Sequence, residues 1–541
     1  LSNKAVRKKM TSMPFLGCEQ LSVRFYQQKQ KVIRNLSLTI DRGEKVLILG
    51  PSGGGKSTLL SVLSGIIPEH IEAEISGKVY LQKSKGVMFQ DPDTQFCMLR
   101  VDEEVAFSLE NRGIPKRKMK AIIKQLLEQV GLGDLEVKTP IEELSGGMKQ
   151  RLALACILAL EPEVMFFDEP TAQLDPASRQ AMFALLKSLA EETDKTMIFV
   201  EHVLDGCIEW MDRVILINGQ GELIADGKPE DIFLTYKEEI RAAGIWQPEL
   251  FPNKWSDVVT DDAHPISIKF FHRLREQQES SLRERSDMET VLETRHFDIG
   301  YGKTSIIKAI TINLRKGEWV SIIGENGSGK STLLKSLVRL EPVKSGEVFI
   351  KGRELKAWSD QALYETAGYV FQNPEHQFIT NTVYDEIAFG GRQRHWPEER
   401  VHEQTCALLE EFGLSELKDA HPFTLSFGQK RRLSVATMLL LDQEIVFLDE
   451  PTFGQDANTA HQLIERLRKR QAQGTTIVMV THDMALVDRY SDHVIVLGDG
   501  KVIYQGKPYP LFSQSEILEQ AGLMPPLPYQ WAAARKEVPI L

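Results

Sequence analysis

The chain has 541 residues, 42% hydrophobic and 26% charged, with a net charge of −11, and this balance does not favour nucleic acid as a partner. One hydrophobic core stops growing at roughly 250–300 residues, so at least two domains are expected. No apolar run approaches the roughly 18–20 residues that span a bilayer, and no secretory signal is evident. The five cysteines are scattered without C-x-x-C spacing, which disfavours disulfide, zinc or iron–sulfur frameworks.

The second half of the chain repeats the first. GPSGGGKSTLL at Gly50 recurs as GENGSGKSTLL at Gly324, and MFQDPDTQF at Met88 recurs as VFQNPEHQF at Val370. VMFFDEPT and IVFLDEPT come next in the same order, and the ends of the two repeats also match. A repeat of this length indicates a duplicated domain.

The repeats set the expected domain boundaries. The first domain is predicted over residues 15–252 and the second over residues 291–530. Residues 253–290 between them are polar and charged, so we expect a solvated linker, partly helical.

Short β-branched runs alternate with longer amphipathic stretches in each repeat. KVLILG (45–50) and TMIFVEH (196–202) are expected to be buried strands of the first repeat, and WVSIIG (319–324) and TIVMVTH (476–482) of the second. This alternation predicts an α/β fold with a mainly parallel sheet flanked by helices.

The motif G-x-x-x-x-G-K-S/T comes after a predicted strand and opens a predicted helix in both repeats, which is the context of a P-loop. Its backbone N–H groups and the helix N-terminus would hold phosphate oxygens. Lys56 and Lys330 are expected to reach the β- and γ-phosphates of ATP, and Ser57 and Ser331 to hold Mg²⁺. The expected ATP-binding residues of the two loops are Gly50, Pro51, Ser52, Gly53, Gly54, Gly55, Lys56, Ser57 and Thr58, and Gly324, Glu325, Asn326, Gly327, Ser328, Gly329, Lys330, Ser331 and Thr332.

Two acidic residues stand at the end of a buried strand in each repeat. Asp168 and Asp449 each end a four-residue apolar run, and a buried carboxylate there needs a cation such as Mg²⁺. Glu169 and Glu450 come next and could polarise an attacking water. The alternative is that these acids are capping or salt-bridged residues.

A glutamine and a histidine also come after strands at matched positions. Gln90 and Gln372 could ligate Mg²⁺ or orient water, although such a glutamine is often only a polar loop residue. His202 and His482 end apolar strands and are expected to contact the γ-phosphate, the alternative being an ordinary histidine at a sheet edge.

The segment LSGGMKQR (144–151) resembles the signature motif of ABC ATPases, and the other motifs stand in the order of that family. The resemblance implies that each repeat is an ABC cassette with an antiparallel β subdomain and a helical signature subdomain. It also implies that the two cassettes pair head to tail and sandwich two ATP molecules. Tyr26 (or Phe25) and Tyr301 match the aromatic residue that stacks on adenine.

The resemblance assigns each ATP site a signature from the opposite cassette. Site one, built on the first P-loop, would receive LSFGQKRR (425–432), with Ser426 and Gly428. Site two, built on the second P-loop, would receive Ser145, Gly146 and Gly147. Phe427 replaces the first glycine of the pair, which predicts slower hydrolysis at site one, because glycines allow a close approach to phosphate.

QDPDTQF and QNPEHQF are similar to the matching segments of energy-coupling factor (ECF) transporter ATPases, and the end of each repeat resembles the short C-terminal extension of that group. That similarity implies a transmembrane coupling subunit and a membrane substrate-binding subunit as partners, and a peripheral position at the cytoplasmic face of the membrane. The fused form resembles ATPases assigned to hydroxymethylpyrimidine or thiamine uptake. The alternatives are an ABC-F type translation factor, a binding module in which ATP is only a switch, and the ATPase of an exporter.

Overall fold

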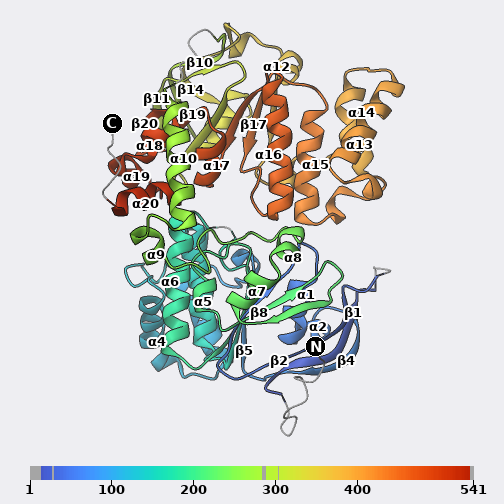
Figure 1. Ribbon diagram of the computed structural model, residues 1–541, viewed down its shortest axis with the longest axis vertical. Coiled ribbons are helices and arrows are strands. Elements are labelled where there is room, and N and C mark those ends of the chain that lie inside the picture. The colour runs from blue at the N-terminus through green and yellow to red at the C-terminus, as the bar shows by residue number, and fades with distance from the viewer. Residues whose placement is uncertain (1–13, 27–29, 173, 283–287, 302–303, 536–541) are drawn as a thin grey trace. The chain divides into compact units, whose positions relative to one another are not determined.

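The computed structural model describes residues 14–26, 30–172, 174–282, 288–301 and 304–535 (Figure 1). The chain folds into two compact units, one formed by the chain up to Pro252 and the other by most of residues 253–541. Each unit combines a six-stranded sheet, a smaller antiparallel sheet and a group of helices. Along the described part of the chain, no helix is both long and apolar enough to cross a bilayer.

The central sheet of the first unit has the strand order β5-β6-β7-β3-β8-β9. Its first five strands are parallel and β9 is antiparallel to β8. The inner strands are apolar throughout, as expected for a sheet covered on both faces. The strands are β3 (Lys45–Leu49), β5 (Lys85–Met88), β6 (Val164–Asp168), β7 (Thr196–Val200), β8 (Arg213–Ile217) and β9 (Leu223–Gly227).

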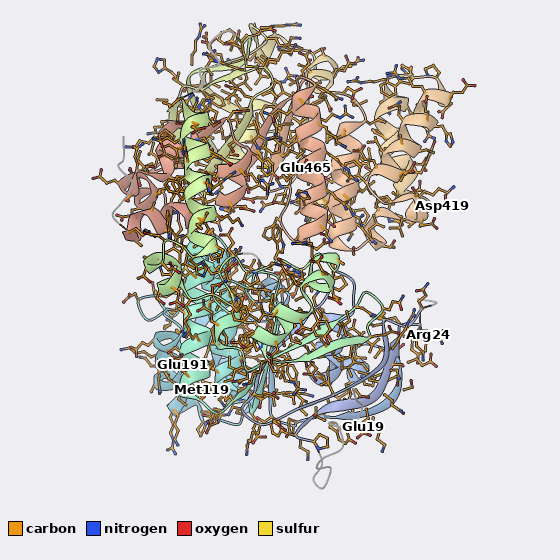
Figure 2. All side chains as sticks on the ribbon, viewed as in Figure 1. Glu19, Arg24, Met119, Glu191, Asp419 and Glu465 are labelled. Atoms are coloured by element: carbon orange, nitrogen blue, oxygen red, sulfur yellow. The ribbon has the colours of Figure 1, made fainter. Side chains whose placement is uncertain are left out.

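A three-stranded antiparallel sheet and the helices complete the first unit. The sheet has the order β2-β1-β4, and Arg24 of β1 forms an ion pair with Glu74 of β4. Met119 of α4, labelled like Arg24 in Figure 2, is buried with α3 and α5 in the helical part. The elements are β1 (Leu16–Arg24), β2 (Ile33–Ile40), β4 (Glu74–Tyr80), α1 (Lys56–Leu63), α2 (Ile66–Glu69), α3 (Val101–Asn111), α4 (Lys116–Gln129), α5 (Gly146–Ala159), α6 (Pro176–Glu192), α7 (Pro229–Thr235) and α8 (Lys237–Ala242).

The second unit repeats this plan, with the central order β16-β17-β18-β13-β19-β20. Again only the last pair is antiparallel. The antiparallel sheet has the order β11-β10-β14-β15, with β12 paired to β10. The strands are β10 (Thr290–Tyr301), β11 (Thr304–Ile310), β12 (Asn313–Arg315), β13 (Trp319–Gly324), β14 (Val343–Ile350), β15 (Arg353–Glu354), β16 (Ala367–Val370), β17 (Ile445–Asp449), β18 (Thr476–Val480), β19 (His493–Gly498) and β20 (Lys501–Gly506).

The helices of the second unit include a group that corresponds to α3, α4 and α5, namely α13, α14 and α15. The predicted strands and the predicted α/β class, with an antiparallel sheet and a helical part in each cassette, are thus confirmed. The helices are α9 (Trp255–Thr260), α10 (Pro265–Ser281), α11 (Lys330–Leu337), α12 (Asp360–Thr366), α13 (Val383–Gln393), α14 (Glu398–Glu411), α15 (Phe427–Leu439), α16 (Ala457–Ala472), α17 (Met484–Tyr490), α18 (Pro508–Phe512), α19 (Ser515–Gln520) and α20 (Leu527–Arg535).

The segment expected to be a solvated linker contains α9 and α10, and α10 lies beside α18 and α20 of the second unit (Figure 1). Phe270 and Leu274 of α10 are buried, and the ring of Phe270 lies 6.2 Å from that of Trp531 in α20. The indole of Trp531 donates to the carbonyl oxygen of Val258 at 3.0 Å. Phe270 and Leu274 lie four residues apart on one face of α10, so this face packs while the other stays exposed, with Ile268 and Phe271 among its residues.

Candidate nucleotide-binding sites

The topology brings the predicted site residues to one edge of each central sheet. In the first unit β6, β7 and β3 are neighbours and parallel, so their carboxyl ends lie together. The P-loop comes after β3, Asp168 ends β6, and His202 comes after β7. The second unit repeats this with β17, β18 and β13. Ligands of open α/β sheets bind outside the carboxyl ends of the strands.

The glycines of the P-loop meet specific conformational demands. Gly55 and Gly329 precede helices α1 and α11 with φ of 89° and 94°, in the left-handed region that glycine adopts without strain. A Cβ on Gly324 would lie 2.3 Å from the carbonyl oxygen of Leu497, so only glycine fits there. Each loop therefore directs backbone N–H groups and a helix N-terminus to one place, as phosphate binding requires.

The P-loop lysines are buried inside these loops. Lys56 and Lys330 are each 6% exposed. The Lys56 Nζ donates to the carbonyl oxygens of Gly50 and Pro51 at 2.9 and 3.0 Å, and the Lys330 Nζ to those of Gly324 and Glu325 at 2.9 and 2.7 Å. Burial lowers the pKa of Lys56, with the nearby carboxylates of Glu169 and Asp168 opposing it.

The serine and aspartate expected to hold Mg²⁺ are in contact in both units. The Ser57 hydroxyl donates to Asp168 Oδ1 at 2.9 Å, and the Ser331 hydroxyl to Asp449 Oδ1 at 3.0 Å. Burial raises the pKa of Asp168 to about 6 and also raises that of Asp449. A hydroxyl beside a buried carboxylate that lacks a full counter-charge is a donor set suited to Mg²⁺, which is typically bound by one or two protein ligands and phosphate oxygens.

The glutamate after the aspartate pairs with the histidine in both units. The distance from Nε2 of His202 to Oε1 of Glu169 is 2.9 Å, and that from His482 to Glu450 is 3.0 Å. Burial alone would raise the pKa of Glu169, but the hydrogen bond and charge of His202 and the charge of Lys56 lower it. Gln90 donates to Glu169 Oε2 at 2.8 Å, whereas no such bond joins its counterpart Gln372 to Glu450 among the described residues.

Both glutamates have an unusual backbone that no sequence pattern predicted. Glu169 and Glu450 each have φ of 51°, in the left-handed region that costs non-glycine residues about 1 kcal/mol or more. Their N–H groups donate to Val200 and Val480, the last residues of the neighbouring strands, at 2.8 and 3.1 Å. The conformation turns both carboxylates toward the histidines, and strain of this kind concentrates at functional sites.

The signature segments begin the helices α5 and α15. Ser145 and Ser426 cap these helices, with their hydroxyls accepting from the N–H groups of Met148 and Gln429. A Cβ on Gly147 would lie 3.1 Å from the Ser178 hydroxyl, whereas one on Gly428 would meet open space. The side chain of Phe427, on which the predicted difference between the sites depends, lies outside the described residues.

The adenine-stacking residues are only partly described. Tyr26 is 69% exposed, so its ring is open to a stacking partner, whereas Phe25 packs against the core of the antiparallel sheet. The geometry therefore favours Tyr26 over Phe25 for this role. The side chain of Tyr301 lies outside the described residues.

Three further residues support these sites although the sequence analysis assigned no role to them. Tyr369 of β16 donates to Asp449 Oδ2 at 3.2 Å, and Arg431 of α15 donates to the backbone of Glu450 at 2.6 Å. Glu201, 2% exposed, accepts from the N–H of Thr171 at 3.1 Å and from that of His202 at 2.9 Å. Arg431 stands in the segment LSFGQKRR and Glu201 in TMIFVEH, but the other repeat carries a different residue at each of the three positions, so the repeat did not draw attention to them.

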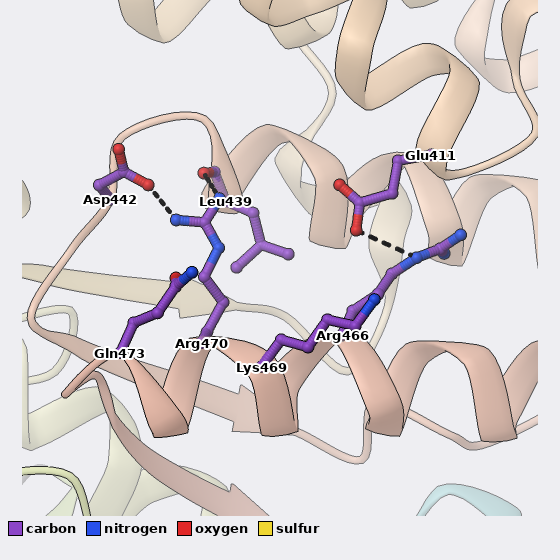
Figure 3. A pocket seen from close by; sticks show the side chains of 7 residues that line it. All are labelled: Glu411, Leu439, Asp442, Arg466, Lys469, Arg470 and Gln473. Atoms are coloured by element: carbon purple, nitrogen blue, oxygen red, sulfur yellow. Dashed lines mark hydrogen bonds and ion pairs between the residues drawn. The ribbon is translucent and has the colours of Figure 1, made fainter.

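A pocket of about 360 Å³ in the second unit is separate from these sites (Figure 3). Four of its charged residues form two pairs, Arg470 with Asp442, and Arg466 with Glu411 at 3.2 Å. Its remaining lining residues are Leu439, Lys469 and Gln473, so none of the predicted site residues contributes to it.

A P-loop, a serine–aspartate pair and a glutamate–histidine pair at one sheet edge define a nucleoside triphosphatase of the P-loop class. The sequence profile of the ABC transporter family matches residues 33–172 and 300–453, one segment in each unit. The chain therefore belongs to the ABC transporter family, as a duplicated ATP-binding subunit that binds and hydrolyses ATP.

Two of the known proteins that resemble the chain match nearly its whole length, and a solved structure matches less than half of it. A Bacillus subtilis (strain 168) protein, provisionally named as the HMP/thiamine import ATP-binding protein YkoD, is 40% identical over 97% of both chains. A protein from Methanosarcina acetivorans, provisionally named as an ABC transporter ATP-binding protein, is 33% identical over 96% of this chain and 90% of its own. A solved structure of CbiO1 from Clostridium perfringens, described as part of the ABC transporter complex CbiONQ, is 32% identical and covers 45% of this chain and 98% of its own, with a TM-score of 0.39.

Proposed function

We propose that this chain supplies the energy for an ECF-type importer of a vitamin or vitamin precursor. It would act at the cytoplasmic face of the membrane, held there by a transmembrane coupling subunit that works with a separate substrate-binding subunit. The observation that carries this proposal is the 40% identity, over 97% of both chains, to a protein named for HMP/thiamine import. The ABC-F alternative is not favoured, because that relative is named for import.

At each site the P-loop lysine would hold the β- and γ-phosphates, and the glutamate would orient the attacking water. The serine and the aspartate would hold Mg²⁺, which when bound neutralises phosphate charge. Glu169 and Glu450 are suited to a general-base role because each already lies within hydrogen-bond distance of a histidine that would contact the γ-phosphate. Gln90, in the loop after β5, and Gln372, in the loop after β16, would each bind Mg²⁺ or orient the attacking water.

Exposed apolar side chains near these loops support a membrane partner. Phe107 on α3 and its repeat counterpart Phe389 on α13 are 37% and 38% exposed. Ile379, seven residues after Gln372, is 65% exposed, and Leu99, nine residues after Gln90, is 83% exposed. Exposed large apolar side chains can mark an interaction site, and in each unit these two residues follow the glutamine of the loop within 17 positions in the sequence.

Membrane fractionation from cells that produce the chain with its neighbouring gene products tests the proposal. The chain should sediment with membranes, be released by an alkaline or high-salt wash, and bring membrane subunits with it when purified in mild detergent. Leu99→Asp combined with Ile379→Asp should release it into the supernatant while ATP binding persists. Retention after alkaline washing, or co-purification with ribosomes instead of membrane proteins, would contradict the proposal.

Uptake measurements test the transported molecule separately. Cells that depend on this transporter should accumulate labelled hydroxymethylpyrimidine or thiamine, and Lys56→Ala with Lys330→Ala should abolish the accumulation. Normal uptake of both compounds in cells without the chain would exclude this substrate class and leave the ATPase assignment standing.

A further inference from the structure

One buried arginine links three parts of the second unit. Arg431 is 0% exposed and lies in the second turn of α15, close to the signature segment that begins this helix. One of its terminal nitrogens donates to the carbonyl oxygen of Phe371, immediately before Gln372. The other donates to the carbonyl oxygen of Glu450 at 2.6 Å. The guanidinium thus bridges the glutamine loop and the backbone of the proposed general base.

The first unit has a glutamine at the matching position. Gln150 is also 0% exposed, and its side-chain amide donates to the carbonyl oxygen of Gln90 at 3.2 Å. This bond reaches the glutamine loop but does not extend to Glu169. Glu169 is instead held through its carboxylate, by Gln90. The two units therefore restrain the corresponding glutamates, Glu169 and Glu450, in different ways.

Burying an arginine side chain lowers the stability of the fold unless its charge is paired or hydrogen-bonded. Burial lowers the pKa of Arg431 to about 10, with Asp449 and Glu450 opposing the shift, so the group stays charged at neutral pH. Arginine presents its donors in a rigid planar fork, which can hold two acceptors at fixed positions, whereas lysine has a single ammonium group. A charged donor on the Glu450 carbonyl also supports a residue whose backbone has a φ of 51°.

We propose that Arg431 is a positioning residue that fixes Glu450 for hydrolysis by bridging its backbone to the glutamine loop. The inference rests on the general-base role proposed for Glu450. Arg431 would act through Glu450 and would not touch ATP itself. Its loss should therefore slow turnover and leave ATP binding, which depends on the P-loop, unchanged.

Steady-state ATPase kinetics of the full-length chain with Mg²⁺ and ATP test this. Arg431→Gln, which installs the residue of the first unit, should lower kcat at least about threefold without raising KM, because a displaced general base loses part of its 10²–10⁴-fold contribution. Arg431→Lys keeps the charge but replaces the two nitrogens of a rigid planar fork with one nitrogen on a flexible stem, so it should also lower kcat. If Arg431→Gln does not fold, Arg431→Lys alone tests the proposal. A wild-type kcat in Arg431→Lys would then show that the arginine bridge does not position Glu450.

Two further variants separate positioning from general destabilisation. Arg339→Gln removes another arginine that donates to two backbone carbonyls, those of Leu355 and Trp358, outside the site, and should leave kcat unchanged. In a Glu450→Gln chain, Arg431→Gln should add no further loss, since both changes remove the same contribution. An additive loss, or a rise in KM that matches the fall in kcat, would show a merely structural role.

The outcome also distinguishes this inference from the proposal on which it rests. If Glu450→Gln itself leaves turnover unchanged, the role of Glu450 is wrong. If Glu450→Gln slows turnover and Arg431→Gln does not, only the positioning role fails.

Discussion

Replacing the P-loop lysines tests the nucleotide sites most directly. Lys56 and Lys330 have equal exposure and each holds two backbone oxygens of its own loop, so the two sites should respond alike. A hydrogen bond from a charged group is worth roughly 1.5–3 kcal/mol, which at about 1.4 kcal/mol per decade gives one to two decades in affinity. Lys56→Ala and Lys330→Ala should each weaken one of two sites by this amount.

Isothermal titration with Mg²⁺ and a slowly hydrolysed ATP analogue measures this effect. With the free analogue at the wild-type Kd, each intact site is half occupied, so the wild-type chain should bind about one equivalent, each single variant about half of that and the double variant almost none. Lys45→Ala is the matched control, because the Nζ of Lys45 also donates to a carbonyl oxygen, that of Gly43 at 2.9 Å, but lies outside the loop. Two equivalents bound with wild-type affinity by the double variant would refute the assignment of both loops.

Individual side chains lead to three more predictions. Glu450→Gln should reduce the ATPase rate of the assembled transporter more than Glu169→Gln, and Phe427→Gly should narrow the gap; equal losses that Phe427→Gly does not alter would refute the asymmetry. The pKa of Asp168 in the folded chain, about 6, lies above its unfolded value of about 3.9, so without nucleotide the folded state takes up a proton and gains stability as pH falls through 6. Asp168→Asn should therefore raise the unfolding temperature of the metal-free chain at pH 7.5, and this increase should disappear near pH 4.5. An increase that does not depend on pH would contradict the raised pKa of Asp168. Trp531→Ala should cost about 3–5 kcal/mol in urea unfolding of the second unit, because the indole is 5% exposed; a loss below about 1 kcal/mol would show that α20 does not secure α9 and α10.

The sequence predicted those parts of the sites that depend on strand ends. Asp168 and His202 could be placed because each stands at the end of an apolar run, and parallel strands bring their carboxyl ends to one edge. The serine–aspartate contact could be expected from the P-loop motif itself. Duplication strengthened each assignment, because chance matches do not recur in the same order.

Other features depend on packing that no local pattern encodes. The bond from Arg431 to Glu450 joins residues 19 positions apart, through a helix and a strand that meet only in the folded unit. The packing of Phe270 against Trp531 joins the two ends of the second unit, so the charged sequence of α10 concealed its apolar stripe. The left-handed backbone of Glu169 was hidden because glutamate rarely adopts it.

The two sites differ in how the glutamate is restrained, and this bears on their rates. In the first unit, Gln90 and His202 contact different carboxylate oxygens of Glu169, so both oxygens are engaged. A water there must share Oε2 of Glu169 with Gln90, whose bond takes up one of the acceptor positions of the carboxylate. In the second unit, Arg431 holds Glu450 through its backbone, and Tyr369 holds the neighbouring Asp449. Within the described part of the chain, the glutamine loop makes no hydrogen bond to the carboxylate of Glu450. Preorganisation of this kind lowers the cost of reaching the transition state. It therefore favours faster hydrolysis at site two, independently of the phenylalanine in the second signature.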